Sequence, residues 1–150
     1  MWFSDRLSPP RPWIALLAAL LLALVPSAAR ADILIVTAAD SAIEQLSRDE
    51  AEQLYLGRKA SLSASTPLQL LDLPPGELRD QFYRLLTGKN PIQTRAYWSR
   101  MVFTGRALPP TESANVSDAH RILLENPNAI AYLPATYAED PSLRVLLRLE

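Results

Sequence analysis

Short apolar runs alternate with amphipathic segments along this chain, and that alternation limits its fold more than any other feature. Runs typical of strands occupy residues 33–36, 68–71, 129–133 and 143–149. Between them, apolar side chains recur three or four positions apart, the spacing that gives a helix one buried face. This order of strands and helices predicts an α/β fold, with a mostly parallel sheet flanked by helices.

Two of the expected helices have clear end signals. Ser47 and Glu50 form a capping box, so a helix is expected from Ser47 to Leu56. The Pro-Pro-Gly sequence that ends at Gly76 breaks the second strand and opens another helix, which Gly88 ends. These signals place the first half of the domain without reference to any known protein.

Two further helices follow. Asn90-Pro91 begins the third, because proline suits the first helical position. Its buried face is expected to comprise Ala96, Trp98, Met101 and Val102. The fourth helix starts near Val116 and stops at Asn126, which a proline follows.

The first 31 residues have the order of a secretory signal peptide. Arg6 and Arg11 precede an apolar run at residues 13–25, and Ala29-Arg30-Ala31 offers small residues at the cleavage positions. The run is shorter than the roughly 20 residues of a spanning helix, although retention as an anchor stays open. We expect cleavage after Ala31, or a few residues away, and a periplasmic domain at residues 32–150 without a membrane span.

Composition excludes several kinds of chemistry. The 150-residue chain has no cysteine, one histidine and a formal net charge of −1. Thiol catalysis and cysteine-bound metals are therefore excluded, and no basic stripe indicates a nucleic acid partner. His120 lies beside Ser117 and Asp118 in sequence, but adjacency does not make a catalytic triad. We expect no enzymatic activity, no cofactor and no metal site.

Four sequence segments, taken in their order and with their spacing, are characteristic enough to compare with a known family. They are LSRDEAEQLYLGRK at residues 46–59, LRDQFY at 78–83, AYWSRMVFTGRALPP at 96–110 and NPNAIAY at 126–132. In this order they resemble phosphate-type substrate-binding proteins of ABC importers, and in particular a small single-lobe branch. The resemblance implies one lobe of a type II periplasmic-binding-protein-like fold. It also implies capture of a small anion such as phosphate for an ABC permease.

Two groups of residues are candidates for ligand binding. Gly76, Glu77 and Arg79 lie at the start of the second helix, where free amides and a partial positive charge favour an anion. An ordinary helix start, with Glu77 as the favourable anion, explains the same residues. Thr37, Asp40 and Ser41 follow the first strand, and ligands of open α/β sheets collect beyond strand ends. A solvated loop is the alternative there.

A different function is compatible with the same fold. Pro74 and Pro75 have no amide hydrogen to donate to an anion. Asp72 and Glu77 place negative charge where the resemblance would place phosphate. These features favour an envelope interaction or sensory module that has kept the fold without the ligand, with another envelope protein as its partner.

Overall fold

The computed structural model describes residues 32–63 and 67–150. The expected signal peptide at residues 1–31 lies outside the described residues, so its cleavage stays a prediction. The elements in chain order are β1 (Ile33–Ala38), α2 (Arg48–Tyr55), β2 (Gln69–Asp72), α3 (Glu77–Thr87), α4 (Pro91–Phe103), β3 (Thr111–Glu112), α5 (Val116–Glu125), β4 (Ala129–Pro134), the 3-10 turn η1 (Ala135–Tyr137) and β5 (Leu143–Leu149).

The five strands form one sheet in the order β3-β2-β4-β1-β5. β2 pairs in parallel with β3 and β4, whereas β1 is antiparallel to both of its neighbours, β4 and β5. Four strands therefore share one direction, and the expected α/β fold with a mostly parallel sheet is confirmed. The exception is β1, whose carboxyl end lies at the opposite end of the sheet from the carboxyl ends of β2 and β4.

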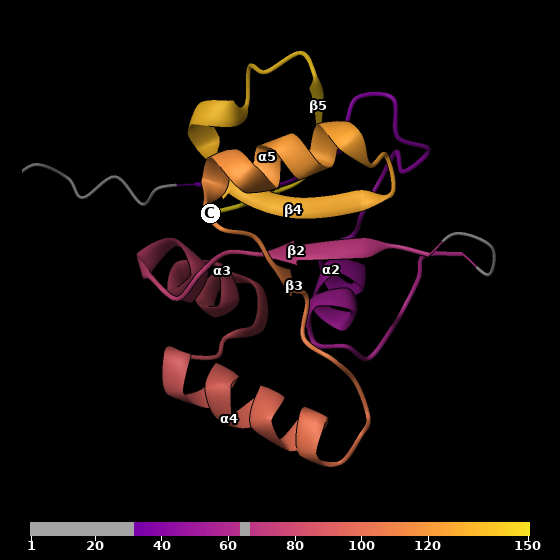
Figure 1. Cartoon of the computed structure of the whole chain (residues 1–150). Helices are drawn as coiled ribbons and strands as arrows, with labels where there is room; N and C mark the ends of the chain where they lie inside the picture. The colour runs from indigo at the N-terminus through magenta and orange to yellow at the C-terminus, as the bar shows by residue number, and fades with distance from the viewer. Residues whose placement is uncertain (1–31, 64–66) are drawn as a thin grey trace, which may run out of the picture. The chain divides into compact units, whose positions relative to one another are not determined.

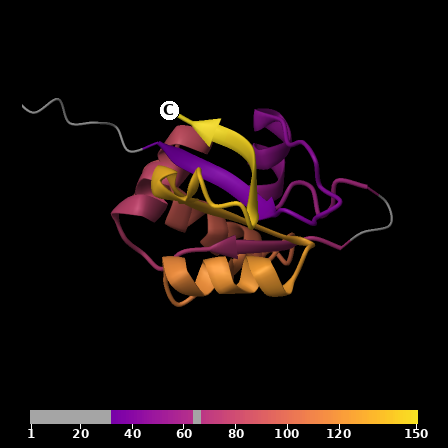
Figure 2. The same ribbon diagram turned by 90° about the horizontal axis from the view of Figure 1, so that it is seen from above.

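Helices cover both faces of the sheet. α5 lies along β4 on one face, and α2 and α3 lie on the other (Figures 1 and 2). β1 runs between β4 and β5 and is fully buried from Ile33 to Val36. A strand covered on both faces has no polar side, which explains why its sequence is continuously apolar rather than alternating.

The helix signals act as expected. Ser47 and Glu50 complete a capping box on α2, and Asn90 with Gln93 completes one on α4. Gly88 ends α3 with a φ of 72°, a conformation that glycine adopts without the steric cost of a side chain.

The expected buried face of α4 is largely wrong. Of its four expected residues only Trp98 is buried, and Val102 is 48% exposed. The reason is the position of α4, which packs against α3 rather than against the sheet (Figure 1). A helix that packs mainly against one other helix buries a narrow stripe, here Thr94 and Trp98. Within the described residues, no helix is long and apolar enough to cross a membrane.

Candidate functional site

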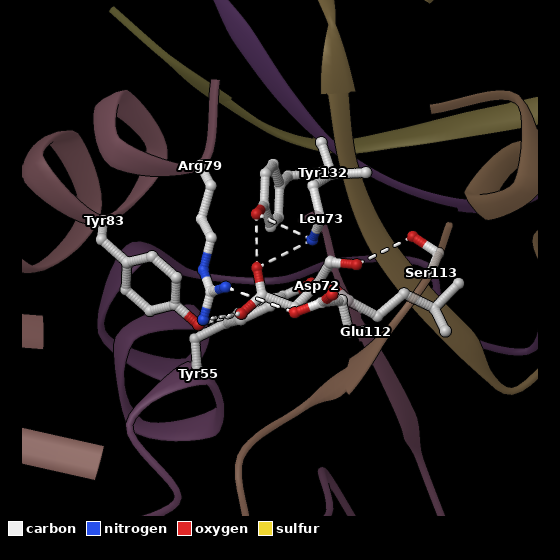
Figure 3. A network of polar contacts seen from close by, with 9 residues as sticks. Tyr55, Asp72, Leu73, Arg79, Tyr83, Glu112, Ser113 and Tyr132 are labelled. Atoms are coloured by element: carbon white, nitrogen blue, oxygen red, sulfur yellow. Dashed lines mark hydrogen bonds and ion pairs between the residues drawn. The ribbon is translucent and has the colours of Figure 1, made fainter. Parts of the chain in front are cut away.

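A buried polar cluster lies where β2 ends, and its centre is the carboxylate of Asp72, which is 2% exposed (Figure 3). Oδ1 accepts hydrogen bonds from the Leu73 amide at 2.9 Å and from the hydroxyl of Tyr132. Oδ2 accepts from the Tyr83 hydroxyl at 2.9 Å and lies 3.2 Å from Nη2 of Arg79. We call these residues the Asp72 cluster. Burial removes both oxygens of the Asp72 carboxylate from water, and each of them accepts from protein donors instead.

The ionisation of the cluster follows from its burial. Loss of water raises the pKa of Asp72, and the donors from Tyr132, Arg79, Tyr83 and Leu73 oppose that rise. Burial, followed by the nearby Asp72 carboxylate, raises the pKa of both Tyr83 and Tyr132. Both hydroxyls therefore remain protonated and donate to the Asp72 carboxylate.

Arg79 connects this cluster to the surface. Its Nη1 lies 3.5 Å from Oε2 of Glu112, a side chain that is 55% exposed. Glu112 belongs to β3, a strand of two residues that the sequence did not predict. β3 is fixed by Ser113, which donates both its amide (2.9 Å) and its hydroxyl (2.8 Å) to the carbonyl oxygen of Asp72. A strand of two residues is too short to show an alternating pattern, so only the serine after the proline-rich loop could have indicated β3.

The start of α3 differs from the other helix starts. α2, α4 and α5 each have a side chain that caps the first turn, whereas α3 begins at Gly76 with no side-chain cap. A hollow of about 250 Å³ lies at this point, between residues 73–79 and the start of α5 at residues 114–116. The sequence candidates Gly76, Glu77 and Arg79 all line it. We call it the α3 hollow, and the uncapped amides give it a partial positive charge.

The second candidate group lies elsewhere. Thr37 is fully buried inside β1, and its hydroxyl donates to the carbonyl of Ala129 at 2.8 Å. Ser41 donates to the carbonyl of Pro127 at 2.5 Å, and Asp40 is exposed. Because β1 is antiparallel, all three residues lie beside the start of β4, at the opposite end of the sheet from Asp72. The two candidate groups therefore do not form one site.

His120 takes part in a different pair. Its Nε2 lies 2.8 Å from Oδ2 of Asp140, not against Ser117 or Asp118. Hydrogen bonds from Ser142, and then from His120, lower the pKa of Asp140. Asp140 therefore contacts both Ser142 and His120 and lies between them. In a catalytic triad the histidine lies between the nucleophile and the orienting acid instead. In residues 32–63 and 67–150, no group of three or more acidic or histidine side chains is placed to hold a metal ion.

Comparison with known proteins gives a likeness of fold. No family of known proteins matches the sequence, and no curated protein matches it either. Among solved structures, a protein from Clostridium perfringens described as a phosphate ABC transporter substrate-binding protein, with phosphate bound, is similar over 77% of this chain, with 17% identity and a TM-score of 0.59. An ABC-type phosphate transport receptor from Vibrio cholerae is similar over the same share, with 13% identity and a TM-score of 0.57.

A protein from Planctomyces limnophilus described as a phosphate-binding protein gives the same result, with 16% identity and a TM-score of 0.56. This chain matches 45%, 46% and 41% of the three proteins, less than half of each. The described domain therefore has the fold of one lobe of a phosphate-type substrate-binding protein, as the sequence motifs implied. At these identities the likeness concerns the fold.

Proposed function

We propose that this chain is an exported, non-catalytic solute-binding-like protein of the periplasm, which captures a small anion such as phosphate in the α3 hollow for an ABC importer. The observation that carries the proposal is the start of α3 at Gly76, uncapped and open to a hollow while the other three described helices are capped. Uncapped helix amides are ready donors to an anion. The fold shared with phosphate-binding proteins supports the same function.

Arg79 is the charged group available to such an anion. Its pair with Asp72 is buried and stays in place, but its pair with Glu112 is half exposed and contributes at most about 1 kcal/mol. An incoming anion can take the place of Glu112 on Nη1. With helix amides and one shared arginine, we expect a dissociation constant for phosphate on the order of 1 mM.

Calorimetric titration of the full chain with phosphate tests the proposal. Glu112→Gln removes the competing carboxylate, so phosphate should bind about fivefold more tightly, since about 1 kcal/mol is roughly a factor of five. Glu125→Gln is the matched control, because Glu125 also pairs with an arginine, Arg121, but lies on α5 outside the hollow. Equal affinities in the wild type and Glu112→Gln, or no heat at about 10 mM phosphate, would contradict anion capture.

A second function has its own supporting observation. Two carboxylates, those of Asp72 and Glu112, already pair with the single positive charge of Arg79, and Glu77 adds another negative group at the hollow. A module that keeps the fold and binds an envelope protein instead would need no free positive charge. Absence of binding to phosphate, sulfate and acetate, together with a specific partner recovered by crosslinking in cells, supports this alternative.

A further inference from the structure

The segment around α4 carries positive charge without any negative charge. The chain has 16 acidic residues against 15 basic ones, yet residues 81–111 contain no aspartate or glutamate. The basic residues of this segment are Arg84, Lys89, Arg95, Arg100 and Arg106. Among the residues that the structure describes, none of these side chains takes part in an ion pair. The segment is therefore a basic patch on a chain that is acidic elsewhere.

The same segment exposes large apolar side chains. The three most exposed ones of the described chain all belong to it, and they are Phe103 (92%), Leu108 (80%) and Ile92 (75%). A single exposed apolar residue is ordinary on a protein surface. Several on one helix and its following loop, beside unpaired positive charge, are typical of an interaction surface.

The outer face of α4 orders these two kinds of side chain. Ile92, Ala96, Ser99 and Phe103 are all exposed and follow one another at intervals of four, three and four residues, so they form one stripe along the helix. The buried stripe of Thr94 and Trp98 faces the other way, toward α3 (Figure 1). We call the exposed stripe the α4 ridge.

Two arginines flank the α4 ridge. With 3.6 residues in each helical turn, Arg95 falls on one side of the ridge and Arg100 on the other, and both are exposed. A basic helix with such an apolar stripe is typical of a segment that lies on a membrane surface.

The inner side of α4 is fixed to the rest of the fold. The Tyr97 hydroxyl donates to the Leu56 carbonyl at 2.6 Å, which ties α4 to the end of α2. The Trp98 ring packs on Gly57 so closely that a β-carbon there would lie 3.0 Å from the ring carbon Cη2. The ridge therefore faces outward before any partner arrives, and binding needs no prior folding step.

An anionic lipid surface matches both properties of this face. Its phosphates attract Arg95 and Arg100, whose long side chains can reach the headgroups while the ridge between them inserts more deeply. Its acyl chains take up Ile92 and Phe103. A rigid protein partner would need a matching groove for side chains that project this far, whereas a fluid lipid surface yields to them.

A hollow beside the ridge gives lipid further contact. It has a volume of about 670 Å³ and lies between α3 and α4, where Arg95, Val102 and Phe103 are part of its lining. A headgroup or the upper part of an acyl chain has room there, next to both a positive charge and an apolar wall.

We propose that the α4 ridge docks this chain on an anionic lipid surface, such as a membrane that contains phosphatidylglycerol. Ile92 and Phe103 enter the acyl region, and the flanking arginines contact the lipid phosphates. The ridge includes no residue that lines the α3 hollow, so this contact is separate from anion capture there.

Fluorescence from one labelled position of the full chain tests the proposal. Because the chain has no cysteine, Ser99→Cys provides a unique attachment point on the ridge for an environment-sensitive dye. Ser117→Cys, at an exposed position on α5, is the matched control. With vesicles of phosphatidylglycerol and phosphatidylcholine in equal parts, the dye at position 99 should brighten and shift to the blue. The dye at position 117 should not, and phosphatidylcholine alone should have little effect on either.

Paired substitutions test the role of charge. Arg95→Gln with Arg100→Gln should weaken the vesicle response about 25-fold, because each arginine near an anionic surface contributes about a fivefold gain in affinity. Arg58→Gln with Arg121→Gln changes the net charge equally at exposed positions elsewhere, so it should have much less effect. All variants keep residues 1–31, so any contribution of that segment to vesicle binding is common to every comparison.

Phe103→Ser tests the apolar contact. It should weaken the vesicle response about tenfold, because a phenylalanine side chain no longer leaves water. The urea midpoint of unfolding should stay the same, since Phe103 contributes little to the packed interior. Leu124→Ser, at a position on α5 that is 48% exposed, is the control and should leave vesicle binding unchanged.

Several outcomes would overturn the proposal. They are a dye at position 99 that does not respond, one that responds equally to anionic and neutral vesicles, and equal responses at positions 99 and 117. Binding of poly-glutamate at position 99 without a response to vesicles would assign the face to an acidic protein instead. Phosphate calorimetry reports on the α3 hollow and the dye on α4, so either proposal can fail alone.

Discussion

At the end of the sheet where β1 finishes, Thr37 and Ser41 donate their hydroxyls to backbone carbonyls of Ala129 and Pro127. At the other end, where β2 finishes, the Asp72 cluster is just as well paired inside, but two hollows lie beside it. The first end uses its polar groups to join segments of backbone. The second end fixes its polar groups on one another and leaves the start of α3 without a side-chain cap, which is why we propose ligand binding there.

The largest expected effect concerns the paired interior of the open end. Asp72→Ala leaves Arg79, Tyr83 and Tyr132 without their shared acceptor, and breaking a buried ion pair costs about 3–5 kcal/mol. Urea unfolding of the full chain, followed by circular dichroism, measures the loss. Asp40→Ala at the closed end, where the side chain is exposed, should change stability by less than about 0.5 kcal/mol. Equal effects of the two substitutions would remove the contrast between the two ends.

An effect of intermediate size concerns the contact between Gly57 and the Trp98 ring of α4. Gly57 and Gly88 both have positive φ, 65° and 72°, so alanine is strained at either position. Only at Gly57 does a β-carbon meet other atoms, with the Ala107 β-carbon at 2.8 Å. Gly57→Ala should therefore cost about 1–3 kcal/mol more than Gly88→Ala in thermal or urea unfolding. It should also shift the indole proton signal of Trp98 in nuclear magnetic resonance spectra, whereas Gly88→Ala should not.

The smallest expected effect belongs to the closed end. Thr37→Val keeps the branched shape that suits a strand but removes the hydrogen bond to Ala129, worth about 1 kcal/mol. Phosphate titration should give the same affinity as the wild type. A loss of phosphate affinity in Thr37→Val would show that the closed end takes part in binding and would make the comparison invalid.

Local signals predicted much of this fold because they act over a few residues. The capping box of Ser47 and Glu50, the Asn90 cap and the glycine stop at Gly88 all operate within one helical turn. The direction of β1 could not be predicted in this way. A continuous apolar run specifies burial on both faces, but it does not specify which strands lie beside it or how they point.

The candidate site was predicted in part for the same reason. Gly76, Glu77 and Arg79 lie so close together in sequence that a single helix start brings them to one hollow. The partners of Arg79 come from β2 and β3, 7 and 33 positions away, and only the folded chain joins them. The burial of Thr94 and Trp98 depends on how α4 lies against α3, which no local pattern encodes.

The pairing of β1 has a consequence for how the protein forms. Ile33 pairs with Pro134 on one side and with Leu149 on the other, so the first strand of the described domain lies beside its last two. Its edges stay open while about a hundred further residues are made, and contacts between such distant segments slow folding. The sheet therefore closes only after β5 has been made.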